Sequence, residues 1–140
     1  MSVLDIAATE VVTTGRTETL SGVASTMDDE SVGSVVVEED DLPIGILTDR
    51  EVALALADDP EAGHDTVDDH MTRAVETVSA DADVYEATRT LSEAGVRRAP
   101  IVDDDGHLTG LVSLDDVLHF VEEALDEAED VIEAQSPRLE

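Results

Sequence analysis

The sequence contains no cysteine, no lysine and no tryptophan, and it has a single tyrosine and a single phenylalanine. Without cysteine, the chain can form neither a disulfide framework nor a thiolate metal site, and it has no cysteine nucleophile. No apolar run approaches the roughly 18 to 20 residues of a membrane span. Residues 1–5 lack the basic flank and apolar core of a secretory signal. We therefore expect a cytoplasmic protein that does not enter the membrane.

Acidic residues dominate the charge. The 140 residues include 36 aspartates and glutamates but only seven basic residues, all arginine, for a formal net charge of −29. A surface this acidic repels phosphate backbones and anionic lipids, so we expect binding to neither nucleic acid nor membranes. Hydrophobic residues make up 41% of the chain, which is enough to bury a core and is unlike a disordered acidic tail.

Two interpretations of this charge are open. Self-repulsion would destabilise the compact state in dilute buffer, whereas in roughly 1 M salt the Debye length falls to about 3 Å and the repulsion is screened. The first interpretation is therefore a halophilic type of protein, adapted to a salt-rich cytosol. The second is an acidic surface that recruits a basic partner. The even spread of acid along the chain favours the first.

The chain is an internal repeat. At an offset of 64 residues the aligned pairs include Val11 with Val75, Thr13 with Thr77, and Val32 with Val96. After one extra residue in an acidic turn the offset becomes 65, and residues 45–48 align with 110–113. We predict a first repeat over 1–59, a linker over 60–66, a second repeat over 67–125, and a C-terminal helix extension with a tail over 126–140.

Each repeat predicts the order β-α-β-β-α. A short extended piece precedes an amphipathic helix, two apolar strands joined by an acidic turn, and a closing helix. Asp83 is suited to start the first helix of the second repeat, and Gly95 to end it. One repeat is too small to cover both faces of its sheet. We therefore expect an α/β (α+β) module in which the two repeats pack sheet to sheet with pseudo-twofold symmetry.

The ends of the two repeats carry the most specific motif. Residues 45–52 and 110–117 follow a pattern of glycine, aliphatic residues, serine or threonine, two variable residues, an acid and an aliphatic residue. Met71-Thr72 and residues 96–102 also fit the family that these motifs indicate. The chain resembles a tandem pair of CBS domains, or Bateman module. The resemblance implies a stand-alone regulatory protein that binds AMP, ADP, ATP or S-adenosylmethionine and signals to a separate partner protein.

The resemblance implies a better ligand site in the second repeat. Its residues are Thr77, Val96, Arg97, Arg98, Ala99, Pro100, Ser113, Asp115 and Asp116. Ser113 at a helix N-terminus would face phosphate, the Asp116 carboxylate would accept hydrogen bonds from ribose, and the two arginines would bind phosphate. Alternatively, Ser113 and Asp116 form only a helix cap, and Arg97 and Arg98 only neutralise neighbouring acids. Both roles stay open for the cap residues, because a cap residue can also contact a ligand.

A weaker site is expected in the first repeat. Its residues are Thr13, Val32, Ser34, Val35, Thr48, Arg50 and Glu51. Glu51 replaces the expected aspartate, and Gly33 and Ser34 stand where the second repeat has two arginines, so two phosphate donors are missing. This site is then either empty or holds a different group of a shared ligand.

We expect no metal site and no catalytic residues. The four histidines lack metal-ligand spacing, although residues 64–70 form either a solvated loop or a cation site. Residues 103–106 lack the distal glutamate of a calcium loop and are predicted to form a hairpin turn. An enzyme acting on nucleotides is disfavoured because no acid, base and nucleophile converge.

The last helix continues past the repeat with apolar residues at helical spacing through Ile132. This apolar face packs either on its own module or on a second protomer. CBS pairs commonly form flat antiparallel dimers, so we expect a homodimer. The charge of −29 and Glu51 support an alternative function, a ligand-free structural or dimerisation module.

Overall fold

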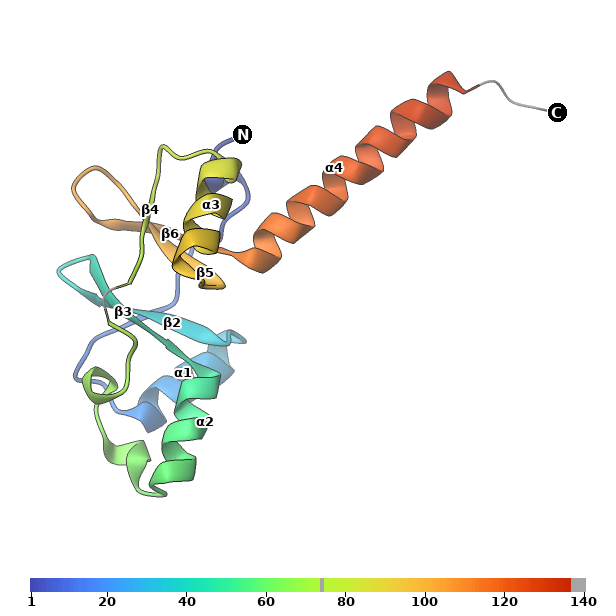
Figure 1. Cartoon of the computed structure of the whole chain (residues 1–140). Coiled ribbons are helices and arrows are strands. Elements are labelled where there is room, and N and C mark those ends of the chain that lie inside the picture. Colours follow the sequence, from blue (N-terminus) through green and yellow to red (C-terminus); the bar gives the residue numbers. More distant parts are fainter. Residues whose placement is uncertain (74, 137–140) are drawn as a thin grey trace.

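The structure is a computed structural model that describes residues 1–73 and 75–136. It contains two three-stranded sheets (Figure 1). The main elements of the first repeat are β1 (Thr13–Thr14), α1 (Leu20–Glu30), β2 (Ser34–Glu39), β3 (Leu42–Thr48) and α2 (Asp49–Asp58). Those of the second are β4 (Val78–Ser79), α3 (Val84–Ala94), β5 (Arg98–Val102), β6 (Leu108–Ser113) and α4 (Leu114–Gln135). The predicted β-α-β-β-α order is confirmed in both repeats.

Both sheets are mixed and have the same topology. β1 is parallel to β2, which is antiparallel to β3, and β4, β5 and β6 repeat this arrangement. Three short 3₁₀ helices complete the fold: η1 (Val3–Asp5), η2 (Ala62–His64) and η3 (Val67–Asp69). η1 and η3 are equivalent under the 64-residue offset.

Helix ends follow the local sequence signals. The Asp83 carboxylate accepts a hydrogen bond from the Glu86 amide at 2.8 Å and caps α3. Gly95 ends α3 in the left-handed region at φ 67°, a conformation that glycine adopts at little cost. Both predictions are confirmed. The predicted hairpin turn at residues 103–106 is also confirmed, since it joins β5 to β6.

The two cores exchange segments between the repeats. Val3 of η1 is fully buried in the second core, where its amide donates to the Ala82 carbonyl at 3.0 Å. In return, Val67 and Met71 lie in the first core with Leu20 and Leu47. The division of the chain at residues 59 and 67 therefore does not divide the cores. Apolar contacts across the repeats, which no local signal reports, determine where η1 and η3 pack.

Two equivalent strand pairings tie each sheet to a segment from outside it. β3 pairs with the segment after η3 through Ile46 and Thr72, and β6 pairs with the N-terminal segment through Leu111 and Ala8. A Cβ at Gly45 would lie 3.0 Å from the Thr72 carbonyl oxygen, and a Cβ at Gly110 would lie 3.0 Å from that of Ala8. The motif glycines therefore permit the close approach of a second backbone, with pseudo-twofold symmetry.

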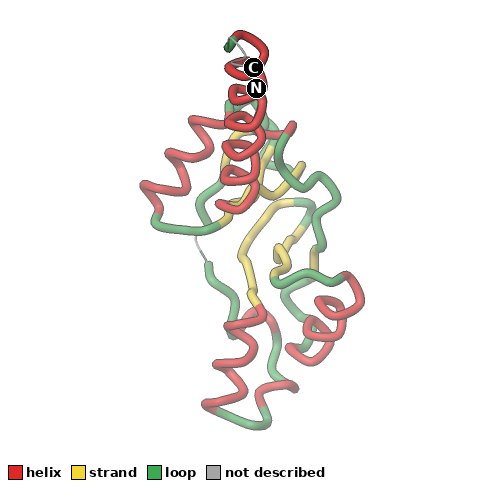
Figure 2. The backbone as a smooth tube through the Cα atoms, turned by 90° about the vertical axis from the view of Figure 1, so that its right-hand side faces the viewer, coloured by secondary structure: helices red, strands yellow, loops and turns green. Residues whose placement is uncertain are grey.

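Helix α4 packs on the second repeat only through its first turns, where Val117 is buried. The rest of the helix projects away from both sheets (Figure 1). In the view of Figure 2, turned by 90°, the helix lies in front of the second sheet. None of the helices in the described part of the chain combines the length and apolar character needed to span a membrane.

Candidate ligand-binding cleft

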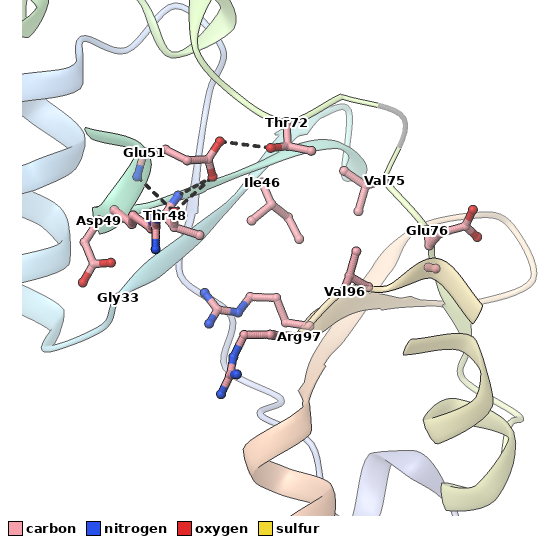
Figure 3. Close-up of a pocket in the computed structure, with 13 residues that line it drawn as sticks. Gly33, Ile46, Thr48, Asp49, Glu51, Thr72, Val75, Glu76, Val96 and Arg97 are labelled. Atoms are coloured by element: carbon pink, nitrogen blue, oxygen red, sulfur yellow. Dashed lines mark hydrogen bonds between the residues drawn. The ribbon is translucent and has the colours of Figure 1, made fainter. Parts of the chain in front are cut away.

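A cleft of about 650 Å³ lies between the two repeats. Its walls come from the end of β3 with the first turn of α2, from the segment after η3, and from the end of α3 with the start of β5 (Figure 3). The lining residues are Gly33, Ile46, Thr48, Asp49, Arg50, Glu51, Thr72, Val75, Glu76, Ala94, Val96, Arg97 and Arg98. Each repeat therefore supplies one side of the same cavity.

Thr48 and Glu51 form a capping box at the start of α2. The Thr48 hydroxyl oxygen accepts from the Glu51 amide at 3.2 Å and donates to Glu51 Oε1 at 3.1 Å. The Thr48 amide also donates to Glu51 Oε1, at 3.1 Å. The other oxygen, Oε2, accepts a hydrogen bond from the Thr72 hydroxyl at 3.0 Å (Figure 3). The positive end of the α2 dipole thus borders the cleft beside a fixed hydroxyl and carboxylate.

Arg50 and Arg98 are the arginines that lack an acidic partner in the described part of the chain, and both line the cleft. The other described arginines form ion pairs, which are Arg16 with Glu39, Arg73 with Asp68, Arg89 with Glu93, and Arg97 with Asp115. The sequence left open that Arg97 and Arg98 only neutralise neighbouring acids. That interpretation fits Arg97 and not Arg98.

The Arg97 pair is weak. Its nitrogen lies 3.7 Å from Asp115 Oδ1, and the two side chains are 69% and 80% exposed. Exposed pairs of this kind contribute little and exchange readily with solvent. Arg97 is therefore also available to the cleft, where Figure 3 shows it opposite Thr48 and Glu51.

The charges within the cleft balance, unlike those of the chain. Arg50, Arg97 and Arg98 line it together with Asp49, Glu51 and Glu76. Three of the seven arginines of a chain with net charge −29 are therefore gathered at one cavity. An anion that enters the cleft therefore meets less electrostatic repulsion than it meets at the rest of the surface.

The remaining wall is apolar. Ile46, Val75 and Val96 converge on the middle of the cavity, between the Glu51–Thr72 pair and Arg97 (Figure 3). Val96 is 41% exposed, although it is aliphatic. A flat apolar group entering the cleft would cover these side chains, while its polar substituents would reach either end.

The sequence profile of the CBS domain matches residues 3–58 and 67–123. The chain belongs to the CBS domain family. Among curated relatives, this CBS pair is 38% identical over 120 residues to protein MK0525 of Methanopyrus kandleri, covering 84% of the chain but 61% of that protein. This chain is also 31% identical to CBS domain-containing protein YhcV of Bacillus subtilis, over 83% of this chain and 82% of that protein.

Other relatives and structures extend this picture. Inosine-5'-monophosphate dehydrogenase of Halobacterium salinarum is 34% identical over 110 residues, which are 77% of this chain and 21% of that enzyme. The CBS pair of protein MJ0100, solved with 5'-methylthioadenosine and S-adenosylmethionine, superposes with a TM-score of 0.78 at 22% identity, covering 89% and 98% of the chains. The structure of CBSX2 in complex with AMP superposes with a TM-score of 0.75 at 20% identity, covering 88% of this chain and 97% of that one. These likenesses show the fold.

The structure groups the expected site residues across the repeats. Val96, Arg97 and Arg98 from the expected better site line the same cleft as Thr48, Arg50 and Glu51 from the expected weaker site. Among the described residues, the other expected ones do not line it: Thr13, Val32, Ser34, Val35, Thr77, Ala99, Pro100, Ser113, Asp115 and Asp116. Residues of the two expected sites meet at this cavity because the start of β5 lies across it from the start of α2, a relation that sequence offset does not encode.

Several of the residues outside the cleft have structural roles. Ser113 and Asp116 form the capping box of α4, with hydrogen bonds of 2.9 and 3.1 Å, as their spacing indicated. Val35 and Ala99 are buried in the first and second cores.

Sequence reasoning missed several residues of the cleft, notably Ile46, Thr72, Val75 and Glu76. Thr72 had a usable signal, since the Met71-Thr72 pair belongs to the family pattern. Val75 and Glu76 lie in the extended segment after it and have no motif of their own. Only the approach of this segment to β3 places them at the cavity.

Carboxylates and histidines elsewhere support turns. Asp103, Asp105 and His107 have ligand atoms within 4.8 Å of one another. However, Asp103 Oδ1 accepts from the amides of Asp105 and His107, both at 2.9 Å, and so holds the β5–β6 turn. Where the linker meets the second repeat, His70 Nε2 lies 2.8 Å from Asp65 Oδ2.

Proposed function

We propose that this CBS pair is a regulatory module that binds an adenosine-containing ligand bearing phosphate in the cleft between its repeats. The observation that carries the proposal is the position of Arg50 and Arg98, which come from different repeats, lack acidic partners among the described residues, and line one cavity. Guanidinium groups are well suited to phosphate. The adenosine compounds bound by MJ0100 and CBSX2 support the ligand class.

The lining residues suggest a role for each end of the cleft. Arg98 and Arg50 would bind phosphate near the N-terminus of α2. The Glu51 carboxylate accepts hydrogen bonds from Thr48 and Thr72, but a carboxylate has about four acceptor positions, so it can also accept from a ribose hydroxyl. Ile46, Val75 and Val96 would cover the adenine. S-adenosylmethionine, which has no phosphate, would use the arginines less than AMP, ADP or ATP would.

Regulation follows from the shared cavity. A ligand that contacts Thr48 of the first repeat and Arg98 of the second stabilises the relative placement of the repeats that brings these residues together. Such a ligand shifts the population toward that placement in proportion to its differential affinity. A separate effector protein that recognises this placement would then respond to the nucleotide.

Calorimetric titration tests the proposal. AMP, ATP, S-adenosylmethionine and adenosine are each titrated into the full chain in 2 M KCl. We expect AMP to bind, and Arg98→Ala to weaken AMP about tenfold or more, because a charge-assisted hydrogen bond contributes roughly 1.5–3 kcal/mol. The affinity for adenosine, which lacks phosphate, should change little in Arg98→Ala.

The matched control is Arg89→Ala, which removes the same charge from an exposed pair with Glu93 on α3. This control should leave AMP affinity unchanged. Absence of binding for all four compounds at millimolar concentration would contradict the proposal. It would favour the ligand-free module, for which the engagement of both Glu51 carboxylate oxygens is the supporting observation.

A further inference from the structure

The distal part of α4 has no packing partner within the described chain. The helix spans Leu114–Gln135, which corresponds to roughly 33 Å at 1.5 Å per residue. From Val121 to Gln135 every residue is exposed. Figure 1 shows this part of the helix standing clear of the two sheets.

Apolar residues on this helix follow a heptad spacing. We call the following set the α4 seam: the apolar Leu114, Leu118, Val121, Leu125, Ala128 and Ile132, and the polar Gln135 at the next position of the same spacing. Their spacing alternates between four and three residues, a mean of about 3.5 that matches a left-handed coiled coil and not an isolated helix. Leu118, Leu125 and Ile132 are 56%, 66% and 65% exposed. Three heptads of such a stripe indicate a helical partner.

The charges of α4 lie entirely outside the seam. The helix has nine aspartates and glutamates and no lysine or arginine, and none of the nine is a seam residue. The two flanks differ: Val117, Ala124 and Val131 border one side, and Asp115, Glu122 and Glu129 border the other. A second copy can therefore bury the seam without burying a carboxylate.

The flanks also distinguish the two orientations of a pair. In a parallel pair, each flank faces the opposite flank of the other helix, so the exposed Ala124 meets Glu129. In an antiparallel pair like flanks meet, which places the acidic flanks against each other. Like charges in contact destabilise an interface. The charge pattern therefore favours the parallel orientation.

We propose that the α4 seam pairs with the same seam of a second copy as a parallel two-stranded coiled coil. Because both helices are acidic, salt should strengthen this pairing. A basic partner helix would show the opposite salt dependence, since salt weakens attraction between opposite charges. The proposal is independent of the ligand site, because the cleft contains no residue of α4.

Light scattering and sedimentation of the full chain in 0.2 and 2 M KCl test the pairing. We expect a dimer that is tighter at 2 M KCl. Leu125→Lys, in the middle of the seam, should raise the dimer dissociation constant at least about tenfold. Asp126→Lys introduces the same side chain at the adjacent outward position and should leave the dimer intact. Both sites are exposed, so circular dichroism should show both variants folded.

Two results would overturn the pairing. One is a wild-type chain that stays monomeric in 2 M KCl. The other is a dimer that Leu125→Lys and Asp126→Lys affect equally, because it would then use another face.

Cysteine crosslinking tests the orientation, since the chain has no cysteine of its own. In a parallel seam, Ile132→Cys lies opposite its own copy, within reach of a disulfide, so oxidation should yield a covalent dimer. Glu133→Cys, on the outward face, is the control and should crosslink poorly. An antiparallel seam instead pairs position 118 with position 128. Crosslinks formed only between Leu118→Cys and Ala128→Cys chains would overturn the parallel arrangement.

Discussion

The carboxylate of Glu51, in the first turn of α2, accepts a hydrogen bond from the Thr72 hydroxyl at 3.0 Å, although 21 residues separate the two along the chain. The same carboxylate completes the capping box with Thr48. In α4 the shorter Asp116 completes the equivalent box with Ser113. The extra methylene of Glu51 thus lets one side chain cap a helix and also reach the segment paired with β3.

Paired substitutions separate capping from ligand binding. Glu51→Ala and Asp116→Ala each break one capping box, so each should lower the free energy of unfolding by about 1 kcal/mol in urea titrations. Only Glu51 lines the cleft. Calorimetry should therefore show weaker AMP binding for Glu51→Ala and unchanged binding for Asp116→Ala. The reverse order of affinities would place the site in the second repeat instead.

The motif glycine of β3 should resist substitution. A Cβ at Gly45 would lie 2.6 Å from Met71 Sδ and 3.0 Å from the Thr72 carbonyl oxygen. Overpacking of this kind costs about 1–3 kcal/mol, so Gly45→Ala should lower the urea midpoint. At Gly15 an added Cβ meets no atom within 4 Å, and Gly15→Ala is the control expected to have little effect. Equal midpoints for the two variants would contradict the close approach of the Thr72 backbone.

We propose that the acidic excess adapts the chain to a salt-rich cytosol. With a net charge of −29, repulsion between carboxylates should lower stability in dilute buffer. The melting temperature measured by circular dichroism should therefore rise substantially between about 0.1 and 2 M KCl, because the Debye length shortens. A melting temperature independent of KCl would instead support recruitment of a basic partner.

The N-terminal segment should contribute directly to the stability of the second repeat. Val3 is fully buried among Val78, Ala99 and Ile101, so Val3→Ala should cost about 1–3 kcal/mol of unfolding free energy. Glu10→Ala, at an exposed position of the same N-terminal segment, should cost little. Hydrogen exchange can locate the loss: amides of β5 and β6 should exchange faster in Val3→Ala. Unchanged protection there would show that η1 contributes nothing to this core.

Local features of the fold could be read from the sequence, because the residues that form them are neighbours. Asp83 and Gly95 bound α3 through hydrogen bonds within a few residues. The strands and their order followed from apolar runs and from the repeat itself. Each of these depends on short sequence separation, so a single window contains the whole signal.

The cleft could be predicted only in part. Thr48, Glu51, Arg97 and Arg98 carry recognisable motifs, but their assembly at one cavity depends on how two sheets face each other. The packing of Val3 on the second core likewise depends on contacts with Val78 and Ile101, more than 70 residues away. The hydrophobic effect is non-directional and does not specify which apolar residues pack together, so these partners could not be predicted from sequence spacing.

The exchange of η1 and η3 has a consequence for how the molecule comes apart. A fragment ending at residue 59 would keep Val3 but lose Val67 and Met71, so its own core would stay open while its apolar N-terminus had nothing to cover. Neither half is therefore a self-sufficient folding unit, and the two halves should melt in one transition. A ligand held at their junction would then protect every strand of the molecule from unfolding, including those it never touches.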